Sequence, residues 1–142
     1  MKLLSKQQKT FFEEEGYLVI DNLLNEAEVT YYSNLYDSFL ENRIDASNYR
    51  SDLSGSDDTI TPWHQDAAYW IDMPDKRAAS CWVAIDRAYK ENGCMWYTPK
   101  SHLSEVLQHE QTGNKGALKC EGSEENSMCI ELTPGSCVFH HG

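Results

Sequence analysis

The sequence has few basic residues, no long hydrophobic run and no paired cysteine motif. Its 142 residues include 12 lysines and arginines against 23 aspartates and glutamates, which gives a formal net charge of -11. Such a surface repels nucleic acid phosphates and anionic membranes, so we expect neither as a partner. The N-terminus becomes charged again directly after Leu4, so it lacks the apolar core of a signal peptide, and no run approaches the length of a membrane span.

The five cysteines exclude two classes of small domain. They are odd in number and irregularly spaced, and no two of them form a C-x-x-C motif. This argues against both a disulfide framework and a zinc ribbon. We therefore expect reduced thiols and a cytoplasmic location. With 40% hydrophobic and 25% charged residues, the composition is that of one globular domain over residues 1–142.

The N-terminal part carries signals for two helices. Ser5 and Gln8 make a capping-box pattern and Gly16 is a C-terminal stop, so we predict a helix over 6–15 and then a strand over 17–20. A second predicted helix has Asn25 as its cap, and its apolar residues recur at helical spacing, as expected of a stripe in the core. That stripe consists of Val29, Tyr32, Tyr36, Phe39 and Leu40.

Beyond residue 60 the sequence favours strands. Turn residues such as Asn92-Gly93 and Pro134-Gly135 separate the strand-like segments. These segments are "TPWHQDAAYW", "AASCWVAID", "GCMWYTP", "SMCIELT" and "CVFHH". The chain is therefore expected to be mainly β with N-terminal helices, with a helical part over 1–43, a polar loop over 44–59 and a β core over 60–142.

The segment 61–70 carries the residues best suited to chemistry. In a strand, His64 and Asp66 would point to the same face about 6.5 Å apart, close enough to share one ion. This pair suits non-haem Fe(II), whose oxygenases use two histidines and one carboxylate, so a third ligand must come from elsewhere. Neighbouring aromatic residues would then wall the site. The alternative is that the aromatic residues form core and the pair is a solvent-facing hydrogen bond.

Four segments resemble, in this order, the phytanoyl-CoA dioxygenase family of Fe(II)/2-oxoglutarate oxygenases. They are "FFEEEGYLVIDNLL", "TPWHQDAAYW", "ASCWVAIDRAYKENGCMWYTPKSH" and "PGSCVFHHG". The resemblance implies a double-stranded β-helix of the jelly-roll or cupin-like kind. It also implies that His64 and Asp66 are two iron ligands, that Trp82 lies beside 2-oxoglutarate and that Gly93 forms a tight turn. The implied reaction is hydroxylation of a small organic substrate by O2, with Fe(II) and 2-oxoglutarate as cofactors.

Two features of the family pattern are not found in this sequence. In relatives, a distal histidine and a 2-oxoglutarate-binding arginine follow "FHHG" within a few residues, which here would place them after Gly142. The sequence also has about five or six strand candidates, whereas a closed jelly roll has about eight. We therefore expect an incomplete barrel, truncated before the distal histidine and arginine, whose free strand edges permit a homodimer.

The other histidines have lesser expected roles. Strand alternation sends either His140 or His141 inward, where it could approach the iron, but we expect both to line the rim of the core without coordinating. His109 lies in a polar stretch and is expected to face solvent. Two alternatives remain open, namely a zinc-dependent cupin-like protein using Cys137 with these histidines, and a non-catalytic remnant or ligand-binding module of the same fold.

Overall fold

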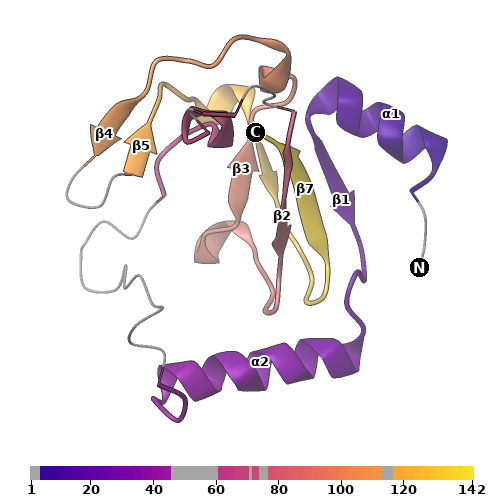
Figure 1. Ribbon diagram of the computed structural model, residues 1–142. Coiled ribbons are helices and arrows are strands. Elements are labelled where there is room, and N and C mark those ends of the chain that lie inside the picture. Colours follow the sequence, from indigo (N-terminus) through magenta and orange to yellow (C-terminus); the bar gives the residue numbers. More distant parts are fainter. Residues whose placement is uncertain (1–3, 46–60, 71, 74–76, 113–116) are drawn as a thin grey trace.

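The computed structural model contains two α-helices in its N-terminal part and a mainly β remainder (Figure 1). It describes residues 4–45, 61–70, 72–73, 77–112 and 117–142. The helices are α1 (Lys6–Glu15) and α2 (Glu26–Leu40). The strands within the described residues are β1 (Tyr17–Ile20), β2 (Ala79–Val83), β3 (Met95–Tyr97), β4 (Glu110–Thr112), β5 (Ala117–Lys119), β6 (Met128–Ile130) and β7 (Cys137–His141). No helix in these ranges is long and apolar enough to cross a membrane.

Helix α1 and strand β1 have the bounds that the sequence predicts. The hydroxyl of Ser5 accepts the N–H of Gln8, and the Gln8 side chain accepts the N–H of Ser5, which completes the capping box. Gly16 ends the helix in the left-handed region, with φ of 82°. Because β1 begins at the next residue, this turn places Tyr17 in the core, where it is 8% exposed.

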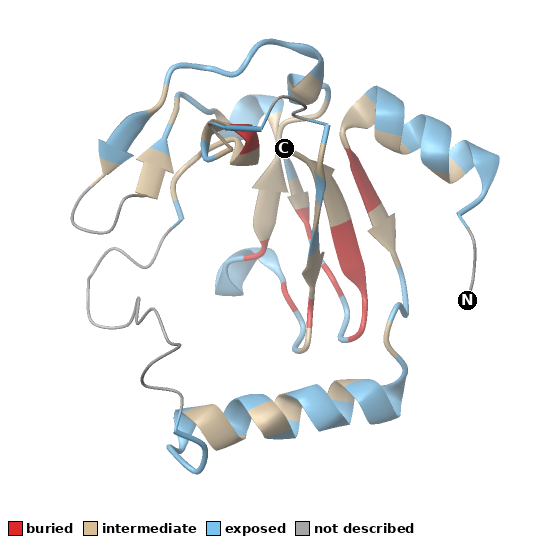
Figure 2. Cartoon of the chain, viewed as in Figure 1, coloured by how far each residue is buried: buried red, intermediate tan, exposed pale blue. Residues whose placement is uncertain are grey.

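Helix α2 has the predicted N-terminus but not the predicted packing. Asn25 and Glu28 form its capping box. No residue of the helix is buried, and Tyr32, Tyr36 and Leu40 are exposed. The helix runs across one end of the strands (Figure 2), where Val29 comes close to Gly135. The expectation that its apolar stripe belongs to the core is therefore wrong, because periodicity identifies an apolar face without identifying what covers it.

The strands of the described residues form three antiparallel sheets. The central sheet has the order β1-β7-β2, and β3 pairs with β6 and β4 with β5. In the central sheet, His140 lies opposite Tyr17 on one neighbouring strand and opposite Ser80 on the other. Because residues two apart share a face of a strand, Ser80 and Trp82 lie on the same face as Val138 and His140.

The core joins the central sheet to the β3–β6 pair. Figure 2 shows the buried residues gathered on these strands and the turns beside them. Trp82 and Tyr97 are partly buried and pack against this cluster. Its buried members are Tyr17, Ala84, Ala88, Cys94, Ile130, Leu132 and Val138.

Two parts of the β region differ from the prediction. Residues 61–65 do not form a strand, and Asp66–Ala68 form a single turn of 3-10 helix. The hairpin of β4 and β5 has no counterpart in the prediction, because its polar residues lack the alternation typical of strands. Gly93 has the expected positive φ, at 89°. The predicted polar loop lies outside the described residues except for its first two positions.

Candidate metal centre

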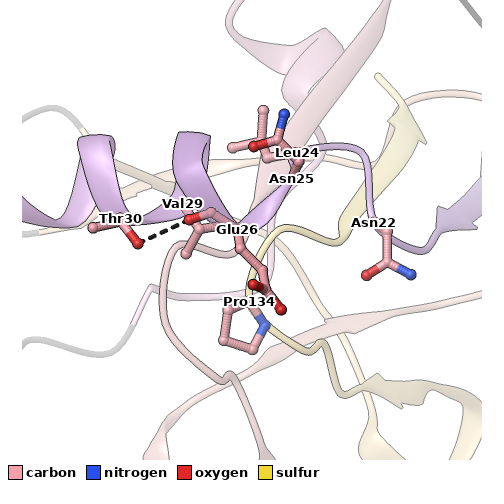
Figure 3. A pocket seen from close by; sticks show the side chains of 7 residues that line it. All are labelled: Asn22, Leu24, Asn25, Glu26, Val29, Thr30 and Pro134. Atoms are coloured by element: carbon pink, nitrogen blue, oxygen red, sulfur yellow. Dashed lines mark hydrogen bonds between the residues drawn. The ribbon is translucent and has the colours of Figure 1, made fainter.

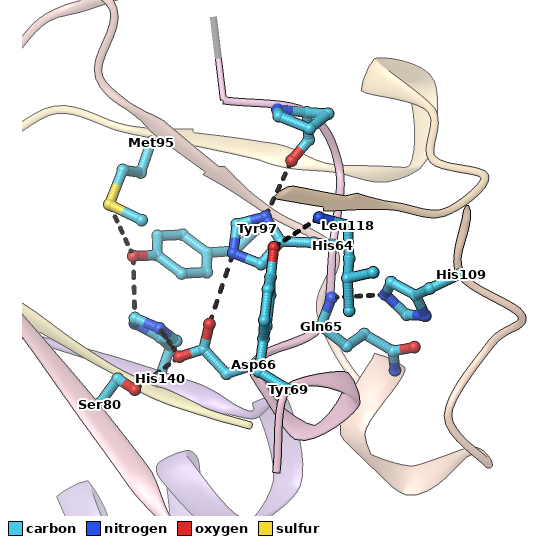
Figure 4. A network of polar contacts seen from close by, with 11 residues as sticks. His64, Gln65, Asp66, Tyr69, Ser80, Met95, Tyr97, His109, Leu118 and His140 are labelled. Atoms are coloured by element: carbon cyan, nitrogen blue, oxygen red, sulfur yellow. Dashed lines mark hydrogen bonds and ion pairs between the residues drawn. The ribbon is translucent and has the colours of Figure 1, made fainter. Parts of the chain in front are cut away.

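His64 and Asp66 lie together at the start of the 3-10 turn, although the segment is not a strand. The Nδ1–H of His64 donates to the carbonyl of Pro62 at 2.8 Å, which directs Nε2 toward Asp66. Nε2 lies 3.4 Å from Asp66 Oδ1 (Figure 4). The ring of Tyr69 meets the His64 ring edge to face, with the centroids 5.8 Å apart. The two residues thus lie close together, as the sequence predicts, but through a turn and not through the strand geometry on which that prediction was based.

The second oxygen of Asp66 is held by the central sheet. The hydroxyl of Ser80, on β2, donates to Oδ2 at 2.6 Å. His140 Nε2, on the neighbouring strand β7, lies 3.2 Å from the same oxygen. Ser80 and His140 are directly opposite in the register of the two strands, so the pairing of β2 with β7 brings both to one atom. Oδ2 thus has two partners, and Oδ1 faces His64.

These contacts shift the acid–base equilibria of the site. The pKa of Asp66 lies well below its usual range, mainly through its hydrogen bonds to His140 and His64, with burial opposing and Ser80 adding to the effect. The pKa of His64 is raised above its usual value, mainly by its hydrogen bond to Asp66, while burial opposes this change. Asp66 is therefore an ionised carboxylate near neutral pH, ready to accept a cation.

Tyr97, on β3, contacts the side of the His140 ring that faces away from Asp66. Nδ1 of His140 lies 3.3 Å from the hydroxyl of Tyr97, which in turn donates to the sulfur of Met95 at 3.4 Å. Burial raises the pKa of Tyr97, so its hydroxyl stays protonated. The Tyr97 hydroxyl thus links the sulfur of Met95 with Nδ1 of His140, while Nε2 of His140 faces Asp66. Strand alternation was expected to send either His140 or His141 inward, and in the structure it is His140 that lies beside Asp66.

Trp82 lies two residues from Ser80 on the same face of β2. It is half-buried, packs against the core cluster and lies opposite Val138. The predicted place of Trp82 beside 2-oxoglutarate remains a prediction. Its position on the face that holds Ser80 is compatible with that role.

Within the described ranges, no three His, Cys, Asp or Glu side chains are spaced to hold a metal ion between them. This finding counts against a zinc site made of Cys137, His140 and His141. The finding also means that Asp66, His64 and His140 do not form a three-ligand set. The two histidines approach different oxygens of the Asp66 carboxylate. His64 Nε2 and Asp66 Oδ1 do face each other. The other polar atoms of these two side chains, Nδ1 and Oδ2, are already hydrogen-bonded to the protein. His64 and Asp66 therefore fit two ligands of an iron centre.

Two other histidines have structural partners that the sequence did not indicate. His102 Nε2 donates to the carbonyl of Glu13 at 2.9 Å, near the end of α1. His109 is half-buried, and its Nε2 accepts the N–H of Gln65 at 3.0 Å (Figure 4). The expectation that His109 faces solvent is therefore wrong. A polar neighbourhood in the sequence did not reveal a bond between residues 44 positions apart.

A separate hollow lies at the start of α2, away from this cluster (Figure 3). Its volume is about 520 Å³. It is lined by Asn22, Leu24, Asn25, Glu26, Val29, Thr30 and Pro134. Glu26 is the sole titratable residue in this lining, and no residue of the Asp66 cluster borders it. The hollow is therefore separate from the candidate metal centre.

The family model "Phytanoyl-CoA dioxygenase (PhyH)" matches residues 53–142, which include both His64 and Asp66. The chain belongs to the phytanoyl-CoA dioxygenase family. Phytanoyl-CoA dioxygenase domain-containing protein 1 of Rattus norvegicus is 44% identical over 87 residues, covering 56% of this chain and 30% of that relative. The chain thus spans less than two thirds of the length of the curated relatives it matches.

Solved structures establish the fold of this phytanoyl-CoA dioxygenase family member. EvdO2 from Micromonospora carbonacea var. aurantiaca, complexed with 2-oxoglutarate, superposes with a TM-score of 0.75 and 20% identity, covering 98% of this chain and 81% of EvdO2. The epimerase SnoN, in complex with Fe3+, alpha ketoglutarate and nogalamycin RO, has a TM-score of 0.67 and 18% identity, with coverage of 96% and 73%. The expected double-stranded β-helix is therefore confirmed.

Proposed function

We propose that this protein is an Fe(II)/2-oxoglutarate-dependent oxygenase that acts on a small organic substrate, with its iron held by His64 and Asp66. The observation that carries the proposal is the approach of His64 Nε2 to Asp66 Oδ1, while Pro62 and Ser80 bond their other polar atoms. Membership of the family supports it. EvdO2 with 2-oxoglutarate and SnoN with Fe3+ and alpha ketoglutarate, which share the fold, hold cofactors of the kind that this proposal requires.

The protein's own contribution is to fix the two ligands before the metal arrives. Because the Pro62 carbonyl accepts from Nδ1 of His64, the neutral imidazole keeps its proton there and presents the lone pair of Nε2. Asp66 is already ionised and is held through Oδ2, so binding requires no proton loss from it. With Fe(II), 2-oxoglutarate and O2 bound, the centre would supply oxidative decarboxylation of the cosubstrate coupled to hydroxylation of a substrate C–H bond.

We assign His140 to the carboxylate rather than to the metal. It shares Oδ2 with Ser80, whereas His64 faces Oδ1. Its work is to keep Asp66 ionised and oriented, as partners of ligating carboxylates do. We further propose that Trp82, on the same face as Ser80, lies beside the bound 2-oxoglutarate.

An anaerobic titration of the chain with Fe(II) and 2-oxoglutarate tests the proposal. The visible charge-transfer band of the chelate should appear with the unmutated chain and be lost in His64→Ala. His102→Gln serves as a matched histidine control, because glutamine keeps a donor near the Glu13 carbonyl. If the band is absent, or if it persists in His64→Ala, the proposed iron site is wrong.

The same titration assigns the role of His140. As a carboxylate partner, His140→Ala should weaken Fe(II) binding about 10- to 100-fold without abolishing it. A loss as complete as that of His64→Ala would instead make His140 a third ligand.

A second candidate function is a non-catalytic ligand-binding module of the same fold. It is favoured by the lack of a ready three-ligand cluster within the described residues. This candidate predicts quenching of tryptophan fluorescence by a small ligand, without Fe(II) binding and without succinate release. Succinate formed by the isolated chain would exclude it.

A further inference from the structure

The segment that carries the two proposed ligands is bonded to a second part of the chain, residues 107–109 and 118–120. The side-chain oxygen of Gln65 accepts the N–H of Leu107 at 2.7 Å. In return, the N–H of Gln65 donates to His109 Nε2 at 3.0 Å. Gln65 lies between His64 and Asp66 in the chain, so both bonds act at the centre of the ligand pair.

The hairpin of β4 and β5 adds two more bonds to the same segment. The hydroxyl of Tyr69 accepts the N–H of Leu118 at 2.7 Å. The carbonyl of Trp63 accepts the N–H of Cys120 at 2.8 Å. Bonds from Leu107, His109, Leu118 and Cys120 therefore brace residues 63–69 at both ends and in the middle, in place of the strand pairing that the sequence predicts there.

The partners of His109 determine which of its ring nitrogens carries the proton. Nδ1 lies 2.8 Å from the carbonyl of Leu107, which can only accept, so Nδ1 donates. Nε2 is then left with a lone pair, which accepts the N–H of Gln65. The imidazole thus connects two backbone groups and has no remaining capacity for a metal or a substrate.

The bond to Gln65 N–H acts on the geometry of His64 as well. The carbonyl of His64 and the N–H of Gln65 belong to one planar peptide unit, so holding the N–H holds the whole plane. That plane sets the direction in which the chain leaves His64 and enters Gln65, whose backbone is extended at φ of -115° and ψ of 130°. Without an acceptor, this partly buried N–H would have to turn toward another partner.

We propose that His109 is a positioning residue for the His64–Asp66 pair, holding the peptide plane between them through its Nε2. This inference rests on the proposed iron site and adds to it a residue that touches neither the metal nor a ligand side chain. It predicts that metal affinity depends on an acceptor at the position of Nε2, rather than on an imidazole as such.

Two conservative variants separate this role from a merely structural one. In His109→Gln the side-chain oxygen can occupy the position of Nε2, so the bond to Gln65 N–H is kept. In His109→Asn the polar atoms reach only the position of Nδ1, so the bond to Leu107 is kept and that to Gln65 is lost. Urea unfolding of the metal-free chains shows whether either variant changes overall stability.

The measurement is anaerobic Fe(II) binding by calorimetry, with His64→Ala as the reference for a lost site. We expect His109→Asn to lose about 10- to 100-fold in affinity, the range for partners that act through a ligand, while His109→Gln stays close to the unmutated chain. Equal affinity in both variants, or equal loss in both, would overturn the positioning role.

A second readout needs no metal and separates this inference from the proposed function. The nitrogen resonances of the His64 ring in the metal-free chain report its contact with Asp66. They should shift in His109→Asn and return in His109→Gln. If the unmutated chain binds no Fe(II) but these shifts occur, the iron site is wrong and the positioning by His109 stands. If the shifts are absent, the positioning role fails whether or not iron binds.

Discussion

At the scale of single residues, the two oxygens of the Asp66 carboxylate have different partners. Oδ2 accepts from Ser80 and from His140, and Oδ1 faces His64. A carboxylate that is held through one oxygen keeps the other in a constant direction. Because one oxygen is held and the other is free to face His64, a short turn can present this proposed metal ligand without the rigidity of a strand.

The Ser80 hydroxyl should therefore affect metal binding without contacting the metal, because it holds the Asp66 carboxylate. We expect Ser80→Ala to weaken Fe(II) binding about tenfold, because Asp66 loses its shortest hydrogen bond. Ser80→Thr keeps the hydroxyl and should bind nearly as well. Calorimetric titration measures both variants, and an unchanged affinity in Ser80→Ala would mean that the bond does not orient the carboxylate.

Two buried cysteines should resist alkylation. Burial is the main cause that raises the pKa of the Cys94 and Cys137 thiols to about 12. A thiol with such a pKa is about one part in ten thousand thiolate at pH 8, and the thiolate is the nucleophile. Iodoacetamide at pH 8, followed by peptide mass spectrometry, should label the exposed Cys81 first and these two only after unfolding. Equal labelling in the folded chain would contradict their burial.

At the scale of elements, the two helices differ in how they are attached. Two carbonyls at the end of α1 accept hydrogen bonds from the β region. The carbonyl of Glu15 accepts the N–H of Lys100, and that of Gly16 accepts the N–H of His141. The His102 ring lies against Gly16 and leaves no room for a side chain there. Neither helix has a buried residue. Helix α2 is attached at its start, where the N–H of Leu24 donates to the carbonyl of Gly135 and Val29 lies close to the same glycine.

Gly16 and Gly93 offer a matched pair for testing the attachment of α1. Both have positive φ, but a methyl group at Gly16 would meet the His102 ring, whereas nothing lies within 4 Å of one at Gly93. Gly93→Ala should cost about 1–2 kcal/mol from backbone strain. Gly16→Ala should cost about 1–3 kcal/mol more, because the ring must also move. Urea unfolding measures the difference, and equal costs would show that His102 moves aside freely.

At the scale of the whole molecule, the core found within the described residues is small. Ten hydrophobic residues are buried there, and half of them are alanine or cysteine. Val138 has the largest fully buried side chain of the described residues, and fifteen large hydrophobic residues among them are exposed. The homodimer suggested by free strand edges remains a prediction.

With so small a core, the free energy of unfolding should change little with urea concentration. The slope of unfolding free energy against urea scales with the surface that unfolding exposes, and it lies at about 1–3 kcal/mol per molar for small proteins. We expect this chain to lie at the low end, near about 1 kcal/mol per molar, by tryptophan fluorescence. A slope above about 2, at a concentration where sedimentation finds a monomer, would contradict the limited burial.

Local signals explain most of the correct predictions at the level of elements. The capping boxes at Ser5 and Asn25 and the stop at Gly16 act over three or four residues, so the bounds of α1 and β1 and the start of α2 could be predicted. Strands β2, β3, β6 and β7 have the hydrophobic composition that burial demands. The polar hairpin β4–β5 could not be predicted in this way, because its stabilising bonds run to residues far away in the sequence.

By itself, the sequence determined the two helix starts, four of the six strands beyond residue 60 and the choice of His64 and Asp66, because capping, apolar patterning and family motifs are carried by neighbouring residues. Tertiary structure alone decided that Asp66 begins a turn, that Ser80 and His140 meet at its Oδ2 and that His109 supports Gln65. The contacts of Asp66 and Gln65 join residues between 14 and 74 positions apart. Such contacts depend on strand register and on the path of the chain, which no local pattern specifies.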